Sequence, residues 1–175
     1  MYIDGQLEQA GARSRLRFTR SLPHAPEKVW RALTEPAQLA AWFPHQIVGD
    51  FVTGASLRFE SNEAGVPTFD GRVTNADPPR LLEFTWGDDL LRFELEPQGT
   101  GTVLTFTDTF DEHGKAARDG TGWHACLDEL GYALDGAPLP WDRVAHWREI
   151  HPGYVESFGP AASTIGPPAC HPVNG

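Results

Sequence analysis

The chain has 175 residues, of which 40% are hydrophobic and 11% aromatic, so it can bury the core of a single domain. Lys and Arg number 14 against 24 Asp and Glu, and the formal net charge of −10 disfavours nucleic acid and anionic membrane surfaces as partners. No stretch approaches the roughly 20 apolar residues that span a bilayer, and the N-terminus lacks a secretory signal pattern, so we expect a cytoplasmic protein without membrane insertion.

The first part of the chain predicts a strand followed by two short helices. Residues 1–12 are polar and contain glycine, and we expect a flexible N-terminus. Residues 15–22, RLRFTRSL, alternate apolar and polar side chains, which is typical of a half-buried strand. In residues 25–43, APEKVWRALTEPAQLAAWF, Pro26 suits a first helical turn, and Pro36 favours a break followed by a second helix.

The middle of the chain predicts six more strands. Six alternating runs lie between Gln46 and Phe110, separated by short breaks rich in Gly, Pro and Asp. Connections this short indicate antiparallel neighbours, because a parallel pair needs a long crossover.

The last part of the chain returns to a helical period after Gly120. One apolar stripe of a long helix consists of Trp123, Cys126, Leu127, Leu130, Ala133 and Leu134. Residues 137–158 predict a helical extension with Trp141 and Trp147 among its anchors, and residues 159–175 predict a disordered tail. The extension either packs back on the domain or forms a homodimer contact.

These elements predict an α+β domain at residues 13–136. A curved seven-stranded antiparallel sheet would be covered by the long C-terminal helix, and the two short helices after the first strand would close one end.

Four separated stretches resemble a known superfamily. They are APEKVWRALTEPAQLAAWF at 25–43, GRVTNADPPRLLEFTW at 71–86, GTGTVLTFTDTF at 99–110 and GWHACLDEL at 122–130. They resemble the helix-grip superfamily called SRPBCC, which includes START lipid-transfer domains and polyketide cyclases. Within it, they are most similar to the branch homologous to the C-terminal domain of the activator of the heat-shock-protein-90 ATPase. The resemblance implies the helix-grip fold and a ligand space between the curved sheet and the long helix.

Candidate ligand-binding residues are the aromatic side chains that should face this interior, with a few polar neighbours. They are Phe43, Phe59, Phe69, Trp86, Phe93, Phe106, Asp108, Trp123, His124 and Leu127. The alternative for the aromatic residues is an ordinary core.

The two polar candidates each have an alternative. Asp108 shares the strand face of Phe106, where a buried carboxylate needs a partner such as Arg92 or a group from outside the chain, unless this end of the strand is solvated. His124 lies at the edge of the helical stripe, so it faces either the pocket rim or water.

Sequence motifs argue against several enzyme classes. The chain has no nucleophile elbow, phosphate-binding loop, dinucleotide fingerprint or zinc-peptidase motif, and we expect no cofactor. Seven histidines lack the spacing of metal ligands, so no metal site is expected; they are His24, His45, His113, His124, His146, His151 and His171. Cys126 and Cys170 suit reduced thiols, with a disulfide as the alternative.

Three functions remain open on the sequence. The first is a small-molecule binding protein for an apolar or amphipathic ligand, lipid-like or polyketide-like. The second, implied by the resemblance, is a protein-partner module that contacts a chaperone. The third is a cyclase-like or aromatase-like enzyme, for which Asp108, His124 and Arg92 are the acid–base candidates, although no catalytic residue can be assigned.

Overall fold

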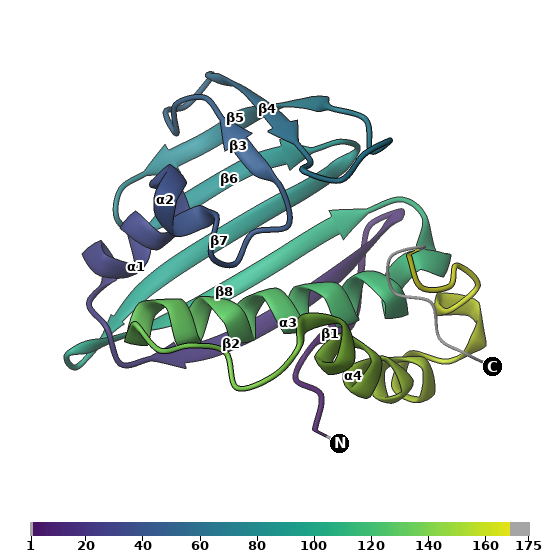
Figure 1. Ribbon diagram of the computed structural model, residues 1–175. Coiled ribbons are helices and arrows are strands. Elements are labelled where there is room, and N and C mark those ends of the chain that lie inside the picture. The colour runs from purple at the N-terminus through teal and green to yellow at the C-terminus, as the bar shows by residue number, and fades with distance from the viewer. Residues whose placement is uncertain (1, 169–175) are drawn as a thin grey trace.

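The computed structural model describes residues 2–168, and these form an α+β domain built on one curved antiparallel sheet (Figure 1). The strands are β1 (Gln6–Ala10), β2 (Arg13–Leu22), β3 (Gln46–Val48), β4 (Ser56–Glu60), β5 (Phe69–Asp77), β6 (Leu81–Trp86), β7 (Asp89–Gln98) and β8 (Gly101–Phe110). The helices are α1 (Pro26–Thr34), α2 (Pro36–Leu39), α3 (Ala116–Asp135) and α4 (Arg143–Phe158), with short 3-10 turns η1 (His113–Lys115) and η2 (Pro160–Ala162).

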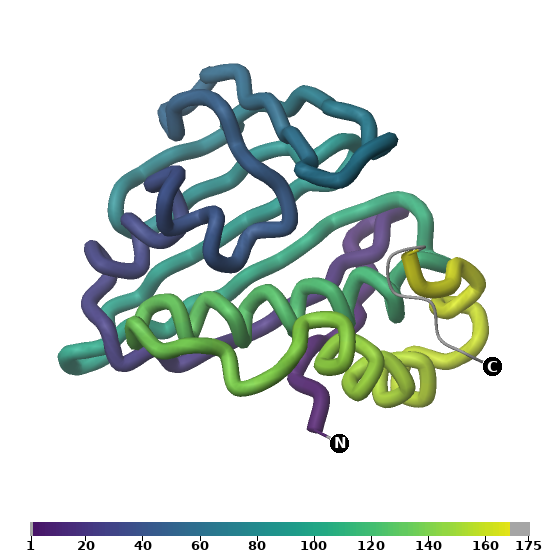
Figure 2. Tube along the Cα trace, in the orientation of Figure 1, coloured from purple at the N-terminus to yellow at the C-terminus, as the bar shows by residue number. Residues whose placement is uncertain are grey.

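The sheet has the strand order β1-β2-β8-β7-β6-β5-β4-β3, in which all neighbours are antiparallel. Helix α3 lies across its concave face, and α4 packs against α3 close to the N-terminal segment (Figures 1 and 2). Within residues 2–168, every helix is too short or too polar to cross a membrane.

Helices α1 and α2 close the part of the concave face that α3 leaves open. Val29 and Leu33 of α1 are buried, and the Trp42 indole nitrogen donates a hydrogen bond of 2.9 Å to the carbonyl oxygen of Ala32. The Trp42 ring also contacts Phe93 of β7 with a centroid distance of 6.1 Å. The aromatic residues of this segment therefore fasten the helix pair to the sheet.

The structure corrects the expected strand number from seven to eight. The additional strand is β1, which lies within residues 1–12, the segment expected to be flexible. Leu7 pairs with Leu16 of β2, Glu8 accepts a hydrogen bond of 2.8 Å from Arg17, and Gly11 adopts a φ of 64° in the connecting turn. The polar composition of residues 1–12 is compatible with an edge strand, because such a strand pairs along one side only and its other side faces solvent.

The extension folds back onto the parent domain. Trp147, Ile150 and Tyr154 of α4 are buried. In the tail expected to be disordered, Pro160–Ala162 form η2, whereas residues 169–175, including Cys170 and His171, lie outside the described residues.

Candidate ligand-binding site

Most of the aromatic candidates pack against one another as the core of the domain. Phe106 lies 4.7 Å from Phe93 and 4.9 Å from Trp123, measured between ring centroids, and Phe43 lies 5.8 Å from Trp123. The buried members of this set are Phe43, Phe59, Phe93, Phe106, Trp123 and Leu127. These side chains fill the space between the sheet and α3, which is the core alternative stated for them.

Phe69 and Trp86 are half-buried, and they form the wall of a surface cleft of about 380 Å³. This cleft lies at the end of the sheet where the β6–β7 turn, the end of β8 and the beginning of α3 meet. Its lining residues are His45, Phe69, Trp86, Gly87, Asp88, Asp89, Asp111, Glu112 and Lys115. We refer to it as the end cleft, and its volume is within the range of small-molecule sites.

The apolar side of the end cleft is built from three rings. His45 lies 5.2 Å from Phe69 and 5.5 Å from Trp86 between centroids, in edge-to-face geometry. Burial lowers the pKa of His45, although the charge of Glu63 opposes this change, so the imidazole is favoured in its neutral form.

Two buried nitrogen atoms of these rings have no hydrogen-bond partner within residues 2–168. They are Nε1 of Trp86 and Nδ1 of His45. An indole N–H is only a donor, and leaving a buried donor unpaired costs about 1–3 kcal/mol. The end cleft therefore combines apolar walls with polar groups that a bound molecule could satisfy.

The polar side of the end cleft is organised by Lys115. Its Nζ is 2.5 Å from a carboxylate oxygen of Asp89 and 3.3 Å from one of Asp119, and it lies 5.2 Å from the centroid of the Phe110 ring. Burial lowers the pKa of Lys115, but the charges of Asp119 and Asp89 outweigh it and the net shift is upward, so the ammonium form is retained.

Asp108 lies behind this cleft and is 0% exposed. One of its oxygens accepts a hydrogen bond of 2.8 Å from Nε1 of Trp123, and the other has no hydrogen-bond partner within the described part of the chain. Burial, reinforced by the charge of Asp89, raises the pKa of Asp108 well above its usual range, so the carboxyl group is favoured in its neutral form.

The partner suggested for Asp108 was wrong. In the register of β7 with β8, Leu91 is opposite Asp108 and Arg92 is opposite Thr107, so Arg92 projects from the other face of the sheet. Arg92 pairs there with Glu83 and Glu94 at 2.9 Å and 2.7 Å. The solvated-strand alternative for Asp108 is also wrong, because Asp108 is 0% exposed and its carboxyl group contacts Trp123 of α3.

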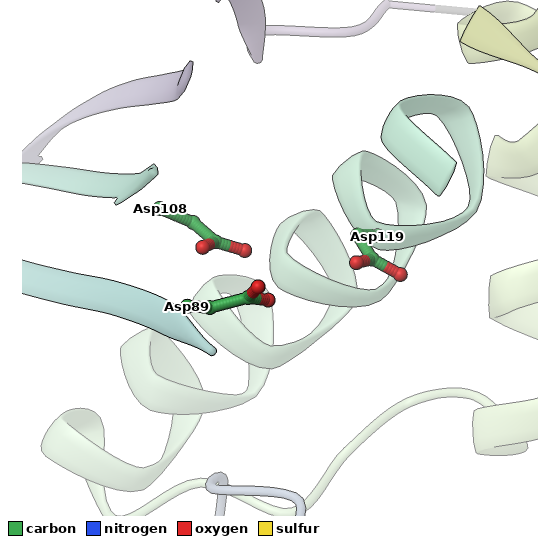
Figure 3. Close-up of side chains that lie close together, drawn as sticks. All are labelled: Asp89, Asp108 and Asp119. Atoms are coloured by element: carbon green, nitrogen blue, oxygen red, sulfur yellow. The ribbon is translucent and has the colours of Figure 1, made fainter. Parts of the chain in front are cut away.

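Oxygen atoms of Asp89, Asp108 and Asp119 lie within 4.8 Å of one another, so these three residues could hold a cation (Figure 3). They come from β7, β8 and α3, and Figure 3 shows the Asp89 and Asp108 side chains extending from adjacent strands toward the helix. The ammonium group of Lys115 already provides positive charge at two of the three carboxylates. The arrangement is that of a buried ion-pair cluster.

His124 neither borders the space under the sheet nor faces water. Its Nδ1 lies 2.9 Å from the hydroxyl oxygen of Tyr154 on α4 and 3.2 Å from a carboxylate oxygen of Asp4. Burial lowers the pKa of His124, opposed by the charges of Asp128 and Asp4. His124 therefore belongs to the contact between α3, α4 and the N-terminal segment.

A second groove, of about 480 Å³, lies at the other end of α3. Its lining residues are Arg20, Ser21, Leu22, Pro23, His24, Leu127, Asp128, Gly131, Tyr132, Asp135, Trp141 and His146. Most of its charged groups pair with each other, as in the contacts of Asp128 with Arg20 at 2.7 Å and with His146 at 2.8 Å. Nε1 of Trp141 and Nε of Arg20 in this groove also lack a hydrogen-bond partner within residues 2–168, although Nε of Arg20 lies 2.6 Å from a carboxylate oxygen of Asp4.

Sequence reasoning missed His45, Asp89 and Lys115 as parts of the end cleft. Each stands beside a strand end or a turn, at Pro44, Gly87–Asp88 and the turn before α3. The sequence feature that could have indicated these three residues is their position at turns between elements, because binding groups often lie on such loops.

Comparison with known proteins places this architecture in a family. Residues 23–135 match the family described as Activator of Hsp90 ATPase homolog 1-like protein. The chain belongs to this family. The match includes the helix pair, β3 to β8 and α3, whereas β1, β2 and α4 lie outside it. Among curated protein sequences, none matches the chain.

Solved structures share the fold of this family member. The conserved protein of unknown function EF2215 from Enterococcus faecalis is 22% identical, with a TM-score of 0.72 over 87% of this chain and 89% of that chain. CalU16 from Micromonospora echinospora is 19% identical, with a TM-score of 0.69 over 90% of this chain and 99% of that chain. The Aha1 dimer from Colwellia psychrerythraea is 25% identical, with a TM-score of 0.59 over 69% of this chain and 95% of that chain.

Proposed function

We propose that the protein binds a small amphipathic molecule in the end cleft. The observation that carries this proposal is the pairing of an aromatic wall, Phe69 and Trp86, with two buried ring nitrogens that lack a protein partner. Burying an apolar ligand surface against these rings is favourable. A hydroxyl or carbonyl oxygen of the ligand could accept a hydrogen bond from the N–H group of Trp86.

The end cleft lies at the N-terminal end of α3, whereas the sequence predicted a ligand in the space between α3 and the sheet. The core candidates Phe93, Phe106 and Trp123 contact each other and leave the aromatic wall of the end cleft to Phe69 and Trp86. Asp108 is fully buried, so the geometry gives it no contact with a molecule in the cleft and does not favour the enzyme hypothesis.

The family also contains chaperone-related proteins by its description, which supports a partner-binding module as the second candidate. The end cleft favours the small-molecule proposal, because its concave aromatic surface suits a compact ligand better than a protein surface.

The test is calorimetric titration with 2-naphthylmethanol, a neutral aromatic alcohol, against the intact protein and two matched variants. Trp86→Phe removes the N–H donor from the end cleft, and Trp141→Phe makes the same change in the groove at the other end of α3. We expect saturable binding that Trp86→Phe weakens by about fivefold to tenfold, the value of one hydrogen bond, while Trp141→Phe leaves it unchanged. Absence of saturable binding, or equal affinity of Trp86→Phe and the intact sequence, would overturn the proposal.

A further inference from the structure

The end cleft has an excess of negative charge, and this bears on the ligand that it could accept. Asp88, Asp89, Asp111 and Glu112 line it, against the single ammonium group of Lys115. Two of the four carboxylates are neutralised by neighbours: Asp89 by Lys115 at 2.5 Å, and Asp111 by Arg13 at 2.7 Å.

Asp88 and Glu112 remain as the charged groups of the rim. Both are exposed, and neither forms an ion pair within residues 2–168. Arg13 approaches Asp88 only through the backbone, where it donates a hydrogen bond of 2.7 Å to the carbonyl oxygen. The two carboxylates therefore face solvent at the mouth of the cleft.

The aromatic wall is also suited to a cation. The face of an aromatic ring attracts an ammonium group within about 6 Å of its centroid, most strongly for an indole. The protein already uses this contact next to the cleft, where Nζ of Lys115 lies 5.2 Å from the centre of the Phe110 ring. Trp86 and Phe69 offer the same kind of surface to a molecule in the cleft.

From the rim charges and the ring wall together, we infer that the ligand of the end cleft is a small aromatic molecule carrying a protonated amine and a hydroxyl or carbonyl oxygen. The apolar ring packs on Phe69 and Trp86, the oxygen accepts the Trp86 N–H, and the ammonium group lies at the rim near Asp88 and Glu112. A molecule with a carboxylate, such as a fatty acid, meets repulsion at the same rim. This inference rests on the proposed binding function and specifies its ligand class.

The experiment compares three probes that share a 2-(hydroxymethyl)naphthalene body, so that each keeps the oxygen that accepts the Trp86 N–H: the 6-aminomethyl derivative, 2-naphthylmethanol itself and the 6-carboxylate derivative, which are cationic, neutral and anionic at pH 7. Calorimetric titration in about 20 mM salt should give the order amine, alcohol, carboxylate. We expect the amine to bind about fivefold more tightly than the alcohol, the value of one charge pair about 4 Å apart in water. At 1 M salt, where the screening length is about 3 Å, this preference should disappear.

A pair of double variants separates a local effect from the net charge of the chain. Asp88→Asn with Glu112→Gln removes two negative charges from the rim, and Glu149→Gln with Glu156→Gln removes two from exposed positions on α4. Only the first pair should abolish the preference for the amine.

The outcomes distinguish the inference from the proposed function. If the alcohol binds at Trp86 but the amine has no advantage, or both double variants reduce that advantage equally, the inference fails and the binding function stands. If none of the three probes binds, the binding function itself fails.

Discussion

The carboxyl group of Asp108 and the imidazole of His124 are both buried, and burial favours the neutral form of each. A change in pH therefore affects the free energy of unfolding with opposite signs at the two residues, because the neutral carboxyl group holds a proton and the neutral imidazole has lost one. Asp108 accepts the Trp123 N–H from within the core, whereas His124 contacts Tyr154 and Asp4 on the outer side of α3. Two neighbouring residues of α3 thus contact different layers of the molecule: Trp123 contacts the sheet, and His124 contacts α4 and the N-terminal segment.

Asp108→Asn should raise the free energy of unfolding at pH 8 by about 1 kcal/mol, because the carboxyl group of Asp108 must take up a proton on folding at this pH, whereas an amide is neutral in both states. The folded protein holds a proton on Asp108 at a pH where the unfolded chain has released it. The contribution of Asp108 is therefore present at low pH and is lost as pH rises from about 3.8 toward the raised pKa.

Urea unfolding of this variant between pH 4 and pH 8 checks the prediction, with the exposed Asp50→Asn as control. A loss of stability in Asp108→Asn that is the same at every pH would contradict it.

His124→Gln should reduce the loss of stability that accompanies acidification below pH 6.5. The lowered pKa of His124 means that the unfolded chain takes up a proton near pH 6.5 while the folded protein stays neutral, so stability falls as pH falls through this range. Buried carboxyl groups with raised pKa values, such as Glu129, contribute with the opposite sign. The difference between the variant and the intact sequence, measured by urea unfolding from pH 7.5 to pH 5, isolates His124. Equal slopes in the two proteins would refute the prediction.

At the scale of elements, Tyr154 of α4 contacts two other segments, the N-terminal segment and α3. The Tyr154 hydroxyl oxygen accepts a hydrogen bond of 3.0 Å from the backbone nitrogen of Gly5 and lies 2.9 Å from Nδ1 of His124. A Cβ at Gly5 would lie 2.6 Å from the Phe18 ring, so only glycine permits this approach of the N-terminal segment. Helix α4, α3 and the segment before β1 are therefore coupled.

Tyr154→Phe should lower the free energy of unfolding by about 1 kcal/mol through the lost hydroxyl contacts, and Tyr154→Ala by about 3–5 kcal/mol through the cavity it adds. The control is Val155→Ala on the exposed side of α4, which should change the free energy of unfolding by less than about 0.5 kcal/mol. Denaturant unfolding of the three variants measures this. Similar effects for Tyr154→Ala and Val155→Ala would show that α4 does not depend on this contact.

At the scale of the whole molecule, α4 turns a helix-grip domain into one with an additional layer. Helix α4 lies on the side of α3 that faces away from the sheet (Figure 1), and its residues Trp147, Ile150 and Tyr154 are buried. The sequence left open whether these apolar residues pack within the chain or against a second copy. Packing within the chain leaves α4 little apolar surface for a homodimer.

We therefore expect the intact chain to sediment as one species at the monomer mass. A chain that ends at Gly136 should self-associate as its concentration rises, because the outer side of α3 becomes exposed. Sedimentation velocity of both proteins tests this expectation. An intact dimer that becomes monomeric on truncation would identify α4 as a dimer contact instead.

Apart from β1 and the 3-10 turns, the sequence alone determined the element types, and it also determined the family. The alternation of Leu16 and Phe18 predicted β2, the spacing of Trp123, Leu127, Leu130 and Leu134 predicted α3, and four separated motifs predicted the family. These signals are local, because side-chain direction repeats every two residues in a strand and every 3.6 in a helix.

Only the tertiary structure decided which residues meet. It paired Asp108 with Trp123, placed Arg92 on the opposite face of the sheet, and brought His45 beside Trp86. It also showed that the pairing of Leu7 with Leu16 adds an eighth strand. These contacts depend on strand register and on the docking of distant segments, and a shift of one residue would reverse every face, which no local pattern determines.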